Sequence, residues 1–170
     1  MATTTSILES QNFLQPNGFK LVINRERFKN LEFFAQTVSH PDISVAPAVA
    51  PFRGTNLQLP GDKVEYGPLV VDAILDENMN VYKEMVKWIK STTDEKHKTY
   101  TSSTSQDRDT TIYDITLSIL SSHNNQIDTI VYKGAFPINV GSVNFQSTVD
   151  NVTYITFPIT FSYTTFTISE

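Results

Sequence analysis

Alternation of apolar and polar residues is the feature that most constrains the fold of this chain. It is clearest from Ile155 to Thr164, where Ile, Phe and Tyr at odd positions alternate with Thr, Pro and Ser at even positions. The same period recurs at residues 18–25 and 113–119. Because successive side chains of a strand point to opposite faces, each of these segments predicts a strand with one buried face. We therefore expect a mainly β protein.

Further strands are expected at residues 31–38, 69–75, 127–133 and 140–146. A charged hairpin connection at residues 25–30 should join the first strand to the second, and a bend from Gly134 to Pro137 should separate the last two. Pro158 interrupts the final alternating run. Proline has no N–H to donate, so that strand is expected at a sheet edge or at a bulge, unless the missing donor faces outward.

Residues 39–68 predict a long extended arm. Prolines exclude a central strand throughout this segment, and they stand at Pro41, Pro47, Pro51, Pro60 and Pro68. A structureless loop of this length is rare in a compact domain, and the apolar residues of the segment favour order, often through contacts with another chain. Short strands are expected near residues 43–50 and 55–59.

One segment has helical rather than strand periodicity. Between about residues 78 and 91, Val81, Met85, Trp88 and Ile89 fall at helical spacing. A helix of this length is marginal alone, so its Trp88 stripe should lie against the sheet. We expect the whole chain, residues 1–170, to form one domain. Within it we expect an N-terminal extension at 1–15 and a polar flexible loop at 92–109.

Composition excludes several classes of function. The chain has 170 residues, no cysteine and a net charge of −5. Tight binding of nucleic acid needs a clustered basic face, which this charge does not favour. No apolar run approaches a membrane span and no signal segment opens the chain, so we expect a soluble protein without membrane contact.

The sequence offers no catalytic constellation. His40, His97 and His123 have no partner at metal-ligand spacing and are expected to be surface imidazoles. Asp72 and Asp114 lie within strand patterns, where outward-facing positions are the simplest interpretation. No glycine-rich phosphate loop or nucleophile elbow is present. We therefore expect no catalytic, cofactor-binding or metal-binding residues, and no enzyme.

The order of these segments resembles the tail tube proteins of contractile-tailed bacteriophages. The resemblance spans residues 13–170, and five segments carry it: Phe13-Leu14-Gln15-Pro16-Asn17-Gly18-Phe19, Leu59-Pro60-Gly61-Asp62, Val64-Glu65-Tyr66-Gly67-Pro68-Leu69, Asp76-Glu77-Asn78 before the Trp88 helix, and Lys133-Gly134-Ala135-Phe136-Pro137-Ile138-Asn139-Val140-Gly141. The last is similar to a Gly-x-x-Pro-x-Asn-Val-Gly turn of that family. Residues 1–12 and the polar excursion at 92–109 depart from its pattern.

The resemblance implies an antiparallel β-sandwich or barrel related in fold to the type VI secretion tube protein. It implies hexameric rings that stack into a tube, through which viral DNA passes without tight binding. Implied partners are the tail sheath, baseplate and terminator proteins, within a virion tail assembled in the host cytoplasm. The residues expected at contacts between subunits are apolar residues of the N-terminus and the arm: Ile7, Leu8, Phe13, Ile43, Val45, Val49, Phe52, Leu57 and Leu59.

Two alternatives stay open. A different ring of the same tail, either the baseplate initiator or the terminator, has a related fold. A monomeric β-sandwich binding module, with a small ligand or glycan held by its loops, belongs to another functional class. A tube protein should form rings or filaments, whereas a binding module should remain monomeric at high concentration.

Overall fold

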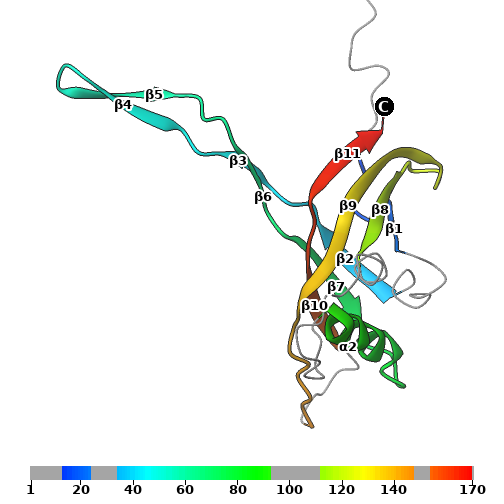
Figure 1. Cartoon of the computed structure of the whole chain (residues 1–170). Helices are drawn as coiled ribbons and strands as arrows, with labels where there is room; N and C mark the ends of the chain where they lie inside the picture. Colours follow the sequence, from blue (N-terminus) through cyan, green and yellow to red (C-terminus); the bar gives the residue numbers. More distant parts are fainter. Residues whose placement is uncertain (1–12, 24–33, 93–111, 148–153, 170) are drawn as a thin grey trace, which may run out of the picture.

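The computed structural model describes residues 13–23, 34–92, 112–147 and 154–169. These residues form a mainly β protein with the helix α2 and a long arm that projects from the packed body (Figure 1). The helix spans Asn80–Thr92. The strands are β1 Phe19–Val22, β2 Ala35–Ser39, β3 Ile43–Val45, β4 Ala48–Phe52, β5 Thr55–Leu59, β6 Val64–Tyr66, β7 Leu69–Ile74, β8 Tyr113–Leu120, β9 Gln126–Val140, β10 Thr156–Ser162 and β11 Thr165–Ser169. The expected fold class is confirmed.

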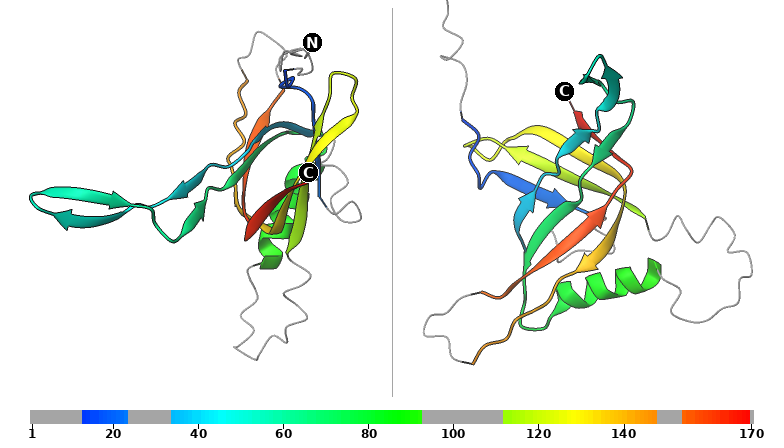
Figure 2. Two further views of the ribbon diagram at one scale, coloured as in Figure 1. Left: turned by 90° about the horizontal axis from the view of Figure 1, so that it is seen from above. Right: turned by 90° about the vertical axis from the view of Figure 1, so that its left-hand side faces the viewer.

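The body is an antiparallel sheet that bends around its longest strand, β9. The strand order is β1-β8-β9-β10-β7-β2, and β11 pairs with β9 off this path. The first half of β9 pairs with β8 and β11, whereas its second half pairs with β10. A strand of 15 residues thereby joins the two layers of the sandwich, which Figure 2 shows from two further directions.

The predicted bend from Gly134 to Pro137 and the predicted strand at 140–146 are both wrong. β9 continues through Gly134 and Pro137 to Val140, and residues 141–147 form no strand. The Gly134 N–H donates to Asp114 Oδ1 at 2.9 Å, and the register with β8 shifts between Tyr113 and Ile115. Glycine therefore produces an irregularity within a continuing strand, where the sequence pattern indicated a stop.

The final alternating run is two strands, β10 and β11. They separate near Thr164, whose N–H donates to the Lys133 carbonyl at 3.0 Å. β10 lies between β7 and β9, so of the alternatives predicted for Pro158 the edge position is wrong, whereas the register with β9 does shift between Thr160 and Phe161. Pro158 is tolerated because its carbonyl accepts from Gly141 N at 2.7 Å, beyond the end of β9. The missing donor of Pro158 faces that same side, where no strand needs it.

The predicted hairpin between the first two strands is also wrong. β1 pairs with β8 and β2 pairs with β7, which places them at opposite ends of the strand order. The strand expected at 31–38 begins only at Ala35. The proposed connection at residues 25–30, the end of the strand expected at 18–25, and most of the loop expected at 92–109 lie outside the described residues.

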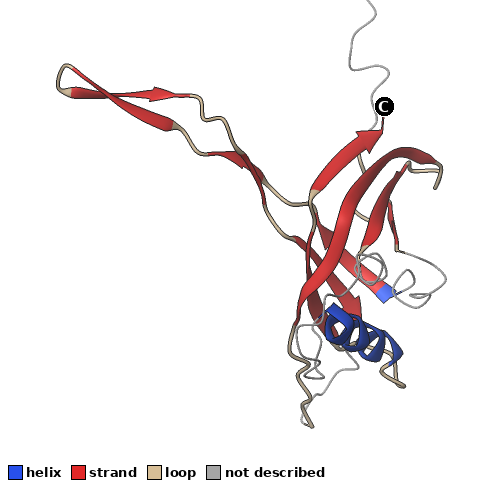
Figure 3. Ribbon diagram, viewed as in Figure 1, coloured by secondary structure: helices blue, strands red, loops and turns tan. Residues whose placement is uncertain are grey.

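The core is formed by buried residues of β1, β7, β8, β9 and β10 together with the buried face of α2. Val81, Met85 and Trp88 are the buried residues of the helix, as its periodicity predicted. The Trp88 ring meets Phe161 at 5.7 Å between centroids. Asp76 Oδ1 accepts from Val81 N at 3.4 Å in the first turn. Side chains of this size contribute about 1.5–3 kcal/mol each on burial, and α2 lies along one side of the sheets (Figure 3).

Candidate assembly interface

The arm is built from two successive antiparallel ladders. β3 pairs with β6, from Ile43 opposite Tyr66 to Val45 opposite Val64. β4 then pairs with β5, from Ala48 opposite Leu59 to Phe52 opposite Thr55. At about 3.3 Å per residue, the segment 43–53 reaches roughly 35 Å from its root. The predicted extended arm and its strand at 55–59 are confirmed, whereas the strand expected near 43–50 is divided into β3 and β4. Figure 1 shows the arm pointing away from the body.

Each ladder has one apolar face. Residues directly opposite each other share a face, and alternate pairs along a strand share it too. On the outer ladder this face carries Phe52, Leu57 and Leu59. On the inner ladder it carries Ile43, Val45, Val64 and Tyr66, whereas Ser44 and Glu65 occupy the other face. The arm therefore presents apolar side chains in a regular order rather than scattered singly.

This apolar surface is open to solvent in the single chain. Phe52 is 57 % exposed, Ile43 is 55 % exposed and Leu57 is 50 % exposed. Of the residues in the four arm strands, only Ala50 is partly buried. Isolated two-stranded hairpins are marginally stable in water, and contiguous exposed apolar surface marks a site of interaction. The arm is the surface of the described chain best suited to contact another molecule.

The structure brings six of the expected contact residues together on the arm: Ile43, Val45, Val49, Phe52, Leu57 and Leu59. Phe13 lies elsewhere, beside Leu120 and Ile127, and is 96 % exposed. Ile7 and Leu8 lie outside the described residues. Sequence reasoning placed Val64 and Tyr66 within the arm but missed the strand β6 and did not include them among the contact residues, although the Val-Glu-Tyr alternation after Gly61 was the signal that could have identified β6.

A cluster of aromatic rings holds the root of the arm against the body. The two segments of the arm are joined at its root by a hydrogen bond, in which the Gly67 N–H donates to the Asp42 carbonyl at 3.0 Å. The Tyr66 ring lies 5.5 Å from that of Phe166 in β11. His40, one residue after β2, has its Nδ1 2.7 Å from the Tyr132 hydroxyl. The direction of the arm is therefore fixed by β9 and β11.

Two phenols, those of Tyr132 and Tyr163, meet at the root of the arm with their rings 5.2 Å apart. Burial raises the pKa of Tyr132 well above its usual value, and the nearby Tyr163 adds to this effect. Burial likewise raises the pKa of Tyr163, followed by the effects of Tyr66 and Asp42. Each phenol therefore keeps its proton. His40 was expected to be a simple surface imidazole, but although exposed it makes the bond to Tyr132.

The other polar residues considered from the sequence have structural roles or open positions. His123 is exposed in the turn after β8, and His97 lies outside the described residues. Asp114 is exposed and its carboxylate accepts from a backbone N–H, whereas Asp72 is partly buried on β7, opposite Pro158. Within the described ranges, no group of three or more His, Cys, Asp or Glu residues is arranged to hold a metal ion.

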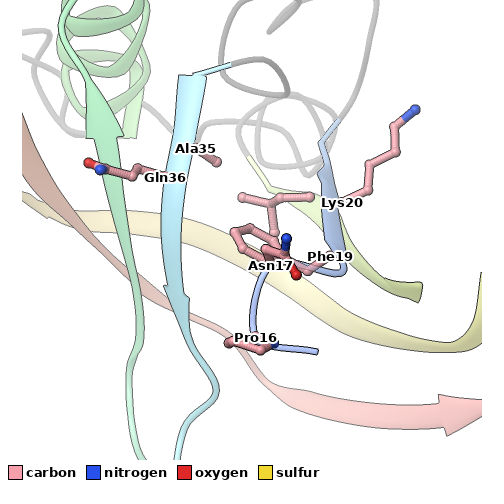
Figure 4. A pocket seen from close by; sticks show the side chains of 7 residues that line it. Pro16, Asn17, Phe19, Lys20, Ala35 and Gln36 are labelled. Atoms are coloured by element: carbon pink, nitrogen blue, oxygen red, sulfur yellow. The ribbon is translucent and has the colours of Figure 1, made fainter. Parts of the chain in front are cut away.

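Cavities on the described part of the chain include one beside β1 and one beside the turn after β8. The larger, about 470 Å³, lies between β1 and β2 and is lined by Pro16, Asn17, Phe19, Lys20, Leu21, Ala35 and Gln36. Figure 4 shows these side chains, with Lys20 projecting away from the others. The smaller, of about 180 Å³, includes Phe13, His123 and Ile127 in its lining. Neither lining contains a carboxylate, so neither cavity presents a pair of acidic groups.

Comparison with known proteins identifies what the chain is similar to. The sequence model of the family described as phage tail tube protein matches residues 5–169. No curated protein sequence matches the chain. Within the described residues, no helix is both long and apolar enough to cross a membrane.

Solved structures share the fold at low sequence identity. A chain of the anti-feeding prophage tube terminating cap is 16% identical, with a TM-score of 0.67 and 99% of each chain covered. A chain of the sheath–tube complex of an extracellular contractile injection system, PVC, is 15% identical, with a TM-score of 0.65 and 99% of each chain covered. A type six secretion system protein is 10% identical, with a TM-score of 0.50, covering 88% of this chain and 81% of its own.

Proposed function

This chain belongs to the phage tail tube protein family, and we propose that it is the repeating subunit of a tail tube. Copies of the chain form hexameric rings, and the rings stack into a hollow tube that conducts viral DNA into the host. The subunit is structural and catalyses no reaction. It works within the virion tail, after assembly in the host cytoplasm.

The observation that carries this proposal is the exposed apolar face of the arm. Phe52, Leu57 and Leu59 lie on one face of a two-stranded ladder that the body does not cover. Such a surface is an aggregation hazard in a monomer, but it becomes a contact surface when a second copy covers it. The arm reaches about 35 Å, far enough to lie along a neighbouring subunit.

The geometry of the contact favours a ring or a filament rather than a dimer. The arm leaves the body at one place (Figure 1), so its apolar face can lie against the body of a neighbouring copy. A contact between two different patches is heterologous, and heterologous contacts form rings or filaments rather than closed dimers. Six copies per ring and axial stacking of the rings complete the proposed tube.

The net charge of −5 supports a tube through which DNA slides. A lumen lined with excess cations would hold the phosphates by counterion release, and each contact would slow the passage. The sheath, baseplate and terminator proteins are the proposed protein partners. Solved structures with this fold include chains from complexes described as a sheath–tube complex and a baseplate.

A terminating ring of the same tail is the second candidate. The similarity to a chain of a tube terminating cap, with a TM-score of 0.67, favours it. The two functions differ in extent of assembly. A repeating subunit stacks without limit, whereas a terminator stops at one ring.

Negative-stain electron microscopy over a concentration series tests the proposal. We expect rings at low concentration and hollow tubes of increasing length at high concentration. Single rings that never stack would favour the terminator. Particles that stay monomeric at every concentration would contradict both functions.

A further inference from the structure

The distal part of the arm contains one charged residue, and it lies at the tip. Between Ile43 and Gly61 the sequence contains one charged residue, Arg53. It lies with Gly54 in the two-residue connection between β4 and β5, and it is exposed. Its guanidinium carbon is 5.6 Å from the centroid of the Phe52 ring. A cation and an aromatic ring therefore end an otherwise uncharged apolar hairpin.

The backbone of the turn does not account for an arginine at this position. Arg53 has φ 42° and Gly54 has φ 86°, and positive φ at both residues is the pattern of a type I′ turn. Asn, Asp and Gly suit its first position, whereas a longer side chain costs about 1 kcal/mol or more there. Asparagine would make a more stable turn. The guanidinium, rather than the turn, explains the residue.

We propose that Arg53 binds a carboxylate on a second copy of this chain when the apolar face of the arm docks there. This inference rests on the proposed function. A second copy suits the role because it carries 18 acidic against 13 basic residues. Guanidinium groups bind carboxylates through two parallel hydrogen bonds, which fixes the relative position of the two molecules.

The described acidic residues differ in how far they are already engaged within the chain. Asp76, Asp114 and Asp128 each accept a backbone N–H of their own chain. Four further carboxylates are exposed. Asp42 packs against Gly67 at the root of the arm, so the first candidates for the partner of Arg53 are the other three: Asp62, Glu65 and Glu77.

The ion pair would act on register and specificity more than on gross affinity. Apolar contacts of Phe52 and Leu57 exclude water around the tip, and an ion pair beside them is less screened than one in open solvent. A wrong register would leave the guanidinium without its carboxylate or beside a like charge, which is costly. Arg53 therefore selects one register among those that the apolar face of the arm alone would allow.

The experiment compares the critical concentration for assembly, measured by sedimentation, across substitutions of Arg53. Arg53→Asn improves the turn but removes the charge, so we expect about a tenfold higher critical concentration. Arg53→Lys keeps the charge but not the paired hydrogen bonds, and its effect should be smaller. Arg53→Glu should have the largest effect. Lys63→Glu, a cation at the base of the arm, is the matched control and should change it less than about twofold.

A charge exchange identifies the partner carboxylate. Asp62→Lys, Glu65→Lys and Glu77→Lys are each combined with Arg53→Glu in the full chain. Restored assembly in one combination assigns the contact to that residue, because the exchanged pair attracts again. Unchanged melting temperatures of all variants show that the body remains folded.

The outcomes separate this inference from the function on which it rests. A wild-type protein that forms no oligomer overturns both. Wild-type assembly that Arg53→Asn and Arg53→Glu leave unchanged overturns the inference alone. If these variants assemble normally but lose binding to a double-stranded DNA fragment, the partner is a polyanion and the inference is again overturned.

Discussion

The body and the arm use the same kinds of strand residues but place them in opposite environments. Phe157, Ile159 and Phe161 of β10 are fully buried, and each lies on a face covered by the rest of the chain. Phe52 and Leu57 of the arm alternate in a similar way, yet both are at least half exposed. The period-two pattern thus specifies a face to be covered and does not specify which chain covers it. In the body the cover is intramolecular, and in the arm we propose that it is a second copy.

The largest expected effect on folding stability comes from a comparison in which one phenylalanine of the body and one of the arm are each replaced by alanine. Phe157→Ala should lower the free energy of unfolding by about 3–5 kcal/mol, because it leaves a cavity in the core. Phe52→Ala should change the same quantity by less than about 0.5 kcal/mol, while raising the critical concentration for assembly. Urea denaturation of the monomer and sedimentation of the polymer provide the two measurements. Equal losses of folding stability would break the distinction between the regions.

Substitutions of two glycines, one in the body and one in the arm, should have effects of intermediate size. A Cβ at Gly141 would lie 2.5 Å from Pro158 Cγ, so Gly141→Ala should destabilise the body by about 1–3 kcal/mol. A Cβ at Gly54 meets nothing within 4 Å, but the φ of 86° disfavours alanine, at about 1 kcal/mol within the turn.

The glycine variants should therefore separate two observables. Thermal melting should detect Gly141→Ala and not Gly54→Ala. Assembly of Gly54→Ala should weaken at an unchanged melting temperature. A lowered melting temperature for Gly54→Ala would mean that the arm contributes to the stability of the body.

The smallest expected effect concerns the root cluster, where the two regions join. Burial raises the pKa of Tyr132 above that of an unfolded tyrosine, about 10. The folded state then holds a proton that the unfolded state releases, so the stability from this group is complete below about pH 10. It is lost progressively as the pH rises from there towards the raised folded value.

Tyr132→Phe tests this pH dependence. It should cost about 1 kcal/mol near neutral pH through the lost bond to His40. Above about pH 10, its free energy of unfolding should fall less steeply with pH than that of the wild type. Urea denaturation at several pH values checks this difference. Parallel slopes would contradict the assignment of Tyr132 as a buried neutral phenol.

Sequence patterns predicted the elements of this chain better than their pairing. The helix at Asn80–Thr92 and the strands β7 and β8 follow from periodicity, because their own residues determine which face is apolar. The hairpin expected between β1 and β2 was wrong since pairing partners depend on the whole sheet. The continuous β9 was missed because a glycine and a proline within a bent strand resemble a turn.

The candidate interface shows the same division. Apolar residues of the arm were predicted as contact residues because a long apolar segment rich in proline favours contact with another chain, and because the family resemblance implies assembly. The structure exposes all six of them. The root cluster could not be predicted, because His40, Tyr66, Tyr132 and Phe166 come from four separate parts of the sequence. The contact of the six arm residues in subunit assembly stays a prediction. The organisation of residues 1–170 as one domain with an N-terminal extension and a polar loop also stays a prediction.

The most direct test of the central claim removes the arm and keeps its root. Ile43 and Tyr66 are direct cross-strand partners, so an Asn-Gly turn can replace residues 44–65 with the favoured hairpin geometry. Sedimentation velocity of this shortened protein and of the wild type over the same concentrations is the measurement. The account predicts a folded monomer with a near-normal melting temperature that forms no rings or tubes. Tubes formed without the arm would contradict it.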